Sequence, residues 1–226
     1  TTVDYNGQYS GNAANAAYAN PDTIYLVYIN VKVCDPTAGV GLESNCVAYR
    51  DGYKPEGLLQ KYAQKLRYSA FGYYNDSSDN PQRDGAILRA RMKYIAPTQP
   101  VPGSAAIANT NREWDATTGV MLANPDPNDA ASTVTDAANA GWATPIANSG
   151  VMNYLNKFGY SAKSYKGKDP VSELYYTAIR YFKKLGNVDS YTSLAGAGNS
   201  ATAASWLDGF PAIRDWYGAD GNQDPI

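Results

Sequence analysis

Residues 86–95 read AILRARMKYI and alternate between two kinds of side chain. Ile87, Arg89, Arg91 and Lys93 alternate with Leu88, Ala90, Met92 and Tyr94, so three bases share one side. A period of two is typical of a half-exposed strand. We therefore predict a strand with an exposed basic face. That face could meet an anionic partner or could be an ordinary solvated sheet face.

Three further segments read as strands. Residues 23–33 are dense in β-branched and aromatic side chains and form the clearest strand pattern. Residues 47–49 are a candidate antiparallel partner for them, and residues 68–74 read as a buried strand.

Two main helices are expected, over residues 56–67 and 170–185. Pro55 and Glu56 are favoured at a helix start, while Asp169, Pro170 and Gly186 supply a cap, a first residue and a stop. A shorter helix over 152–158 should end at Gly159. The apolar positions expected to face the core are Leu58, Leu59, Tyr62, Ala63 and Leu66 in the first helix. In the second they are Val171, Leu174, Tyr175, Ala178, Phe182 and Leu185.

The predicted fold class is α+β, with a mixed or antiparallel sheet packed against these two helices and with long irregular loops. Residues 1–22 read as an amino-terminal arm, and residues 23–226 as a single domain with a loop-rich excursion at about 96–150. Residues 187–226 also read as irregular. Trp206, Phe210 and Trp216 are expected to anchor that tail in the core.

The chain has two cysteines, Cys34 and Cys46, and no histidine. This set cannot build a four-cysteine zinc site or a zinc site of mixed cysteine and histidine ligands. A local disulfide, which implies an oxidising compartment, is the main interpretation, and two buried free thiols are the alternative.

Composition excludes several classes of function. A net charge of -2 makes nucleic acid an unexpected partner, and no apolar run is long enough to insert in a membrane. Without histidine, Ser-His-Asp and Cys-His catalysis are impossible within the chain, and phosphate-binding glycine motifs are absent. Glu43, Glu56, Glu113 and Glu173 read as ordinary loop, helix-start or surface residues. We therefore expect no catalytic residues, no enzymatic activity and no organic cofactor.

Two acidic loops are weak calcium candidates. Asp126 and Asp129 lie in NPDPND, and Asp220, Asn222 and Asp224 lie in ADGNQD. Closely spaced oxygen ligands suit calcium, but neither loop fits the EF-hand register, and each could be a solvated turn.

Several blocks along the chain resemble the type IV pilus tip adhesin and assembly family of the PilY/PilC type. They include YLVYINVKVCD, YKPEGLLQKY, RDGAILRARMKYI, NREWDATTGV and DPVSELYYTAIRYF, and they span about residues 23–192. In that family the segment lies in the amino-terminal, von Willebrand A-like region, ahead of a carboxy-terminal β-propeller. The family's Asp-x-Ser-x-Ser metal motif and its propeller are not found in this sequence, so no metal-site residue is carried over.

The resemblance implies a secreted, non-enzymatic, pilus-associated protein that reaches the cell surface through the periplasm. It implies adhesion and pilus assembly as functions, with minor pilins or a host or abiotic surface as partners. The first residues, Thr1 and Thr2, without an initiator Met, fit either a removed leader or an excised piece of a longer protein. The alternative is a processed filament subunit that self-assembles when residues 1–22, or the tail after Trp216, add to a neighbour as an extra strand.

Overall fold

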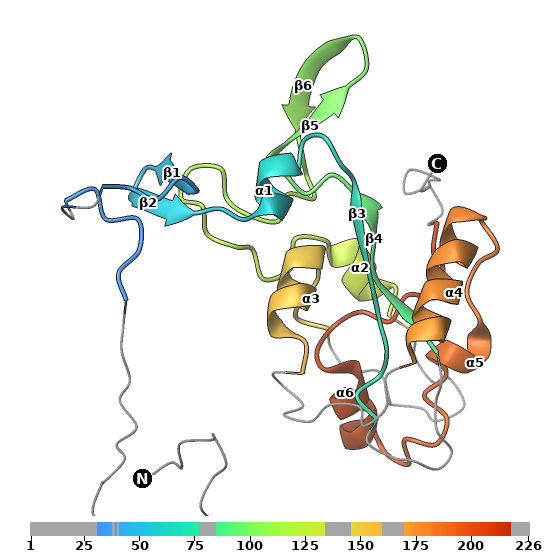
Figure 1. The fold of residues 1–226 in the computed structure, drawn as a ribbon. Coiled ribbons are helices and arrows are strands. Elements are labelled where there is room, and N and C mark those ends of the chain that lie inside the picture. Colours follow the sequence, from blue (N-terminus) through green and yellow to red (C-terminus); the bar gives the residue numbers. More distant parts are fainter. Residues whose placement is uncertain are drawn as a thin grey trace, which may run out of the picture. The chain divides into compact units, whose positions relative to one another are not determined.

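The structure is a computed structural model that describes residues 31–37, 39, 41–76, 85–133, 146–159 and 170–217 (Figure 1). The chain divides into two compact units, Thr1–Ser44 and Asn45–Ile226, and each is described by itself. All twelve helices and strands of the described residues belong to the second unit. Short antiparallel strand pairs and helices give it an α+β fold, as predicted.

The central ladder of the second unit joins β3 (Tyr68–Gly72) to β4 (Ile87–Lys93). The two strands are antiparallel, with Tyr68 opposite Lys93 and Gly72 opposite Ile87, and two register shifts bend the pairing. The strands predicted at 68–74 and 86–95 are therefore confirmed. A later segment adds to β4, because the Ile213 N–H donates to the Leu88 carbonyl at 3.0 Å.

Two further hairpins complete the strand inventory of the described residues. In the first, β1 (Cys46–Tyr49) pairs with β2 (Gly52–Pro55). In the second, β5 (Thr98–Val101) pairs with β6 (Ser104–Ala108). All residues of β6 are exposed, and Figure 1 shows this hairpin extending away from the helices. The strand at 47–49 was predicted correctly, but it pairs with β2.

The predicted single sheet is wrong for the described residues, which form three separate two-stranded ladders. Most of the predicted strand at 23–33 lies outside the described residues, and residues 31–33 are not in a strand.

The first predicted helix is shorter than expected. Helix α1 covers only Leu58–Tyr62: Pro55 ends β2, so the helix begins later than predicted, and residues 63–65 form a turn after its last residue. Gly57 precedes α1, and its N–H donates to the Gln60 side chain at 3.2 Å. Only part of the predicted apolar face is covered: Ala63 is buried, whereas Leu58, Tyr62 and Leu66 are exposed.

Helices α3 (Val151–Lys157) and α4 (Val171–Phe182) both contact β3, and Figure 1 shows the β3–β4 ladder running between them. Both helices were predicted. Tyr154 of α3 packs with Ala70, Ala90 and Phe210. Tyr181 of α4 packs with Leu88, Ile213 and Trp216.

The segments predicted to be irregular contribute three short helices and much of the core. They are α2 (Pro127–Ala131), α5 (Asp189–Thr192) and α6 (Ser200–Leu207). Trp206, Phe210 and Trp216 are buried anchors, as predicted, and Trp114 is buried with Ile95 and Met152. The described part of the loop-rich excursion therefore supplies core residues.

Cys34 and Cys46 are joined in the predicted disulfide. The alternative of free thiols is thereby wrong. Cys34 lies at φ 56°, a left-handed backbone conformation that is uncommon outside glycine.

Candidate contact surfaces and a buried charge cluster

The three bases predicted to form an exposed strand face are buried. Arg89, Arg91 and Lys93 are 1%, 3% and 7% exposed, so the predicted exposed basic face of β4 is wrong. The physical reason is that other segments cover β4: α2 and α3 contact it, and the segment at Ile213 pairs with its main chain. These side chains therefore hold the interior together and offer no contact surface.

Arg89 is held by main-chain carbonyls through its two terminal guanidinium nitrogens, while its buried Nε finds no partner among the described residues. Its guanidinium donates to the carbonyls of Tyr73 at 2.8 Å and Pro211 at 3.0 Å, and to those of Leu207 and Phe210 at 3.3 Å. It also lies 5.5 Å from the Tyr154 ring centre. Main-chain carbonyls and tyrosine rings together offset the cost of burying this cation.

Arg91 and Lys93 share two buried aspartates. Arg91 Nη1 donates to Asp129 Oδ1 at 2.9 Å, and Lys93 Nζ donates to Asp129 Oδ2 at 2.8 Å. Lys93 Nζ also bonds Asp126 Oδ2. Two cations thus face two carboxylates, which is the condition under which buried charges are tolerated. We call these four residues the charge cluster.

The loop NPDPND positions both aspartates. Asp126 caps α2, where its Oδ1 accepts from the Asp129 N–H at 2.9 Å, and Pro127 occupies the first helical turn. Asp126 and Asp129 are fully buried and paired with cations, an arrangement unlike an exposed calcium loop. The other candidate calcium residues, Asp220, Asn222 and Asp224, lie outside the described residues.

Glu113 is a buried carboxylate that the sequence analysis treated as ordinary. It caps the start of α3, since Oε1 and Oε2 each accept a main-chain N–H at 2.7 Å, from Val151 and Met152 respectively. Burial raises the pKa of Glu113, and those two hydrogen bonds act in the opposite direction. One signal in the sequence could have indicated this cap. Gly150 precedes the predicted helix and has no side chain to cap it, so the helix start needs a polar group from elsewhere in the chain.

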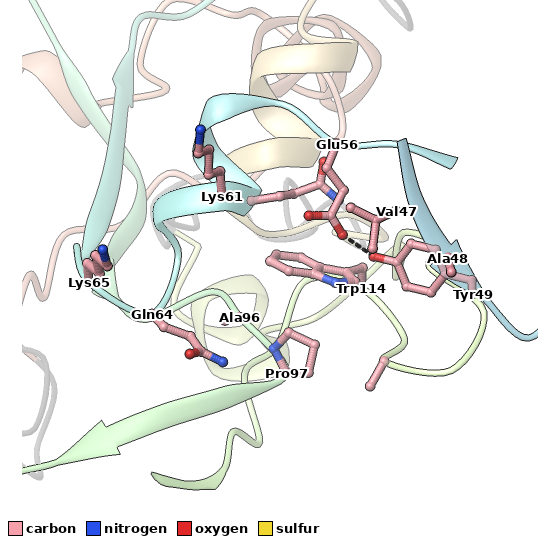
Figure 2. Close-up of a pocket in the computed structure, with 12 residues that line it drawn as sticks. Val47, Ala48, Tyr49, Glu56, Lys61, Gln64, Lys65, Ala96, Pro97 and Trp114 are labelled. Carbon is pink, nitrogen blue, oxygen red and sulfur yellow. Dashed lines mark hydrogen bonds between the residues drawn. The ribbon is translucent and has the colours of Figure 1, made fainter. Parts of the chain in front are cut away.

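A pocket of about 470 Å³ opens on the second unit between α1, the β1–β2 hairpin and the segment around Trp114 (Figure 2). Its lining combines aromatic, acidic and basic side chains. They include Tyr49, Glu56, Lys61, Lys65, Pro97 and Trp114.

Tyr49 is a polar group of the pocket that is held on two sides. Its hydroxyl donates to Glu56 Oε1, as the dashed line in Figure 2 shows. Burial, followed by this hydrogen bond to a carboxylate, raises the pKa of Tyr49 to about 12. The Tyr49 ring lies against Gly119, where an added Cβ would come within 2.7 Å of it. Tyr49 thus remains a neutral hydroxyl in this pocket at physiological pH.

Of the apolar residues predicted to face the core from the helix at 170–185, Val171, Tyr175, Phe182 and Leu185 are exposed, and Leu174 and Ala178 are half-buried. The buried residues of α4 are Thr177 and Tyr181, whereas Val171 and Tyr175 are 65% and 71% exposed, so the predicted core face is wrong. The helix is apolar on two sides, and tertiary packing selects the one that carries Tyr181. Phe182 is also exposed. Val171, Tyr175, Ala178 and Phe182 follow one another at steps of four, three and four residues, and we call them the α4 stripe.

Comparison with known proteins identifies the family. No family model matches the chain, and no solved structure is significantly similar to it. A curated protein of Xylella fastidiosa (strain Temecula1), named type IV pilus biogenesis factor PilY1 homolog, is 49% identical over 211 residues, or 92% of this chain. This chain is a PilY1-type segment. The resemblance found in the sequence blocks is thereby confirmed.

The PilY1-type segment spans 16% of the length of that curated relative. Most of the relative therefore lies outside the matched region. Among those described residues, no helix has the length and apolar character needed to cross a bilayer.

Proposed function

We propose that this PilY1-type segment is a non-enzymatic contact module of a type IV pilus assembly and adhesion protein. In this proposal it is exported through the periplasm, resides at the cell surface, and acts by binding minor pilins or an external surface. The observation that carries the proposal is the 49% identity, over nearly the whole chain, to a protein named as a type IV pilus biogenesis factor.

Three features of the chain support an exported, non-enzymatic role. The Cys34–Cys46 disulfide suits an oxidising compartment. The whole sequence lacks histidine, the commonest proton carrier in catalysis. The buried carboxylates of Glu113, Asp126 and Asp129 are engaged by main-chain N–H groups or cations, which favours a structural role for them.

The α4 stripe is the surface that we assign to a minor pilin. Alternating steps of three and four residues place side chains in one line along a helix, the spacing by which two helices pack together. Val171, Tyr175 and Phe182 are each at least half exposed, and aromatic side chains are enriched where proteins bind one another. We therefore propose an apolar helix of a minor pilin as the partner of α4.

The alternative, a processed filament subunit, is not favoured. The relative is named for pilus biogenesis, and this chain matches only 16% of its length.

The proposal is tested in cells that produce the full-length protein containing this segment. Tyr175→Ser combined with Phe182→Ser removes the two large side chains of the α4 stripe and leaves the buried Tyr181 in place. We expect surface pili per cell to fall several-fold, counted by electron microscopy, while the amount of exported protein stays unchanged.

Leu155→Ser is the matched control, because Leu155 is 50% exposed on α3, as Phe182 is on α4. That variant should leave the pilus count unchanged. Normal piliation in the α4 double variant would rule out the stripe as the site of pilin contact.

A further inference from the structure

The amine of Lys93 lies between two carboxylates in the charge cluster. Nζ bonds Asp126 Oδ2 and lies 2.8 Å from Asp129 Oδ2. The lysine comes from β4 and the aspartates from the cap and first turn of α2, which lie 33 and 36 residues further along the sequence. A primary amine, a carboxyl carbon and a second carboxylate are the parts needed for a condensation reaction.

The surroundings of this trio differ from those of an ordinary ion pair. The side chains of Lys93, Asp126 and Asp129 are 8%, 1% and 0% exposed. In a low-dielectric interior, desolvation reduces the advantage that an ion pair has in water. Lys32 and Asp35 form the exposed counterpart: Nζ and Oδ2 are 2.7 Å apart, but the lysine side chain is 75% exposed.

We propose that Lys93 and Asp126 condense within the folded protein to form an intramolecular isopeptide bond, with Asp129 as the proton carrier. The site is independent of the proposed pilus function.

The reaction balances without an oxidant, a reductant or a co-reactant. Lys93 Nζ begins as an ammonium and passes a proton to Asp129 Oδ2, and the resulting amine attacks Asp126 Cγ. The Nζ–Cγ bond forms, the Cγ–Oδ2 bond breaks, and Oδ2 departs as water with two protons that came from Nζ. One positive and one negative charge disappear together, and Asp129 is returned unchanged.

The hydrogen bonds of Asp126 fit this course. Oδ1, which becomes the amide oxygen, already accepts from the Asp129 N–H at 2.9 Å, and this donor would stabilise negative charge on Oδ1 during attack. Oδ2, the departing oxygen, is contacted by Lys93 and lies 3.4 Å from Asn111 Nδ2. Exclusion of solvent favours the loss of water and protects the finished amide from hydrolysis.

The bond would tie β4 covalently to the start of α2. The loop that it closes contains the β5–β6 hairpin and Glu113. The chain between Lys93 and Asp126 could then not be extended by a force that pulls on the two ends of the chain.

Mass spectrometry of the intact, reduced and denatured chain tests the proposal. The expected mass is that of the sequence less one water. Trypsin should fail to cleave after Lys93, and residues 92–112 should be recovered attached to residues 113–157. Cleavage after Lys32 should be normal, because the exposed pair does not react.

Lys93→Arg keeps the positive charge but removes the reactive amine, and Asp129→Asn removes the proton carrier. Both variants should have the full sequence mass. The wild-type protein decides the matter even if a variant fails to fold. A wild-type chain of full mass, or a water loss that maps away from Lys93 and Asp126, would overturn the proposal.

Discussion

Buried polar side chains decide much of this structure at the scale of single residues. Arg89 is held by carbonyls and aromatic rings, Lys93 by two carboxylates, and Glu113 by the N–H groups of α3. Each of these side chains is removed from solvent but keeps hydrogen-bond or ionic partners. Removing the partner of a buried charge destabilises a protein by about 3 to 5 kcal/mol. These residues therefore constrain how β4, α2 and α3 can pack.

Tyr181 provides a test at this scale through its response to alkali. Its hydroxyl oxygen accepts from the Met92 N–H at 3.0 Å, and burial raises the pKa of Tyr181 to about 12 from the ordinary 10.0. Because the folded-state pKa is the higher one, stability is fully present below pH 10 and is lost as pH rises towards 12.

We expect the free energy of unfolding of the wild type to fall more steeply than that of Tyr181→Phe between pH 10 and 12, by about 2 to 3 kcal/mol. Urea unfolding at several pH values measures this difference. Equal slopes for the two proteins would contradict the assigned burial of the phenol.

The sequence could not show that the bases of β4 are buried. Alternation in residues 86–95 predicts two faces, but it does not say what covers each of them. The aspartates that neutralise Arg91 and Lys93 lie more than 30 residues away in sequence, in a loop whose spacing also suits calcium. The strand and the loop were both predicted from the sequence, but their contact was not.

At the scale of elements, local signals located the helices but not all of their ends. Gly159 follows α3, as predicted, whereas α4 ends at Phe182, before the predicted stop at Gly186, and Pro55 ends a strand and does not begin a helix. The face that a helix buries was less predictable, because α4 is apolar on two sides. The covered side is the one that carries Tyr181, because Tyr181 packs against Leu88, Ile213 and Trp216.

The start of α3 gives a prediction at this scale. Gly150 has φ 92°, and an added Cβ would lie 2.7 Å from Pro125 Cγ and 2.9 Å from Glu113 Cδ. Gly150→Ala therefore combines backbone strain with displacement of the Glu113 cap, and should destabilise the protein by roughly 3 kcal/mol or more.

Gly103→Ala is the control, because Gly103 has φ 71° but open space around its Cβ position. Backbone strain alone should cost about 1 kcal/mol there. Thermal or urea unfolding compares the two variants, and equal losses would show that the Glu113 contact has no energetic weight.

At the scale of the whole molecule, the hydrophobic clusters of the described residues all lie after Asn45. Every described tryptophan also belongs to the second unit, so tryptophan fluorescence reports on that unit. The Cys34–Cys46 disulfide closes a short loop outside those clusters.

Reduction of the disulfide should therefore change the free energy of unfolding of the second unit by less than about 1 kcal/mol, although a loop of this length is worth about 3 kcal/mol to the segment that it closes. Urea unfolding followed by fluorescence, with and without reductant, measures this effect. A large shift of the midpoint on reduction would show that the core depends on the bridge.

The most direct test of the pilus assignment is an exchange between relatives. In a Xylella fastidiosa strain that lacks its own PilY1 homolog, the relative is supplied with its matching region replaced by this chain, and surface pili are counted. The account predicts that this chimera restores piliation to the level of the intact relative, and that the same chimera with Tyr175→Ser and Phe182→Ser does not. Cells without pili, despite normal export of the unmodified chimera, would contradict the account.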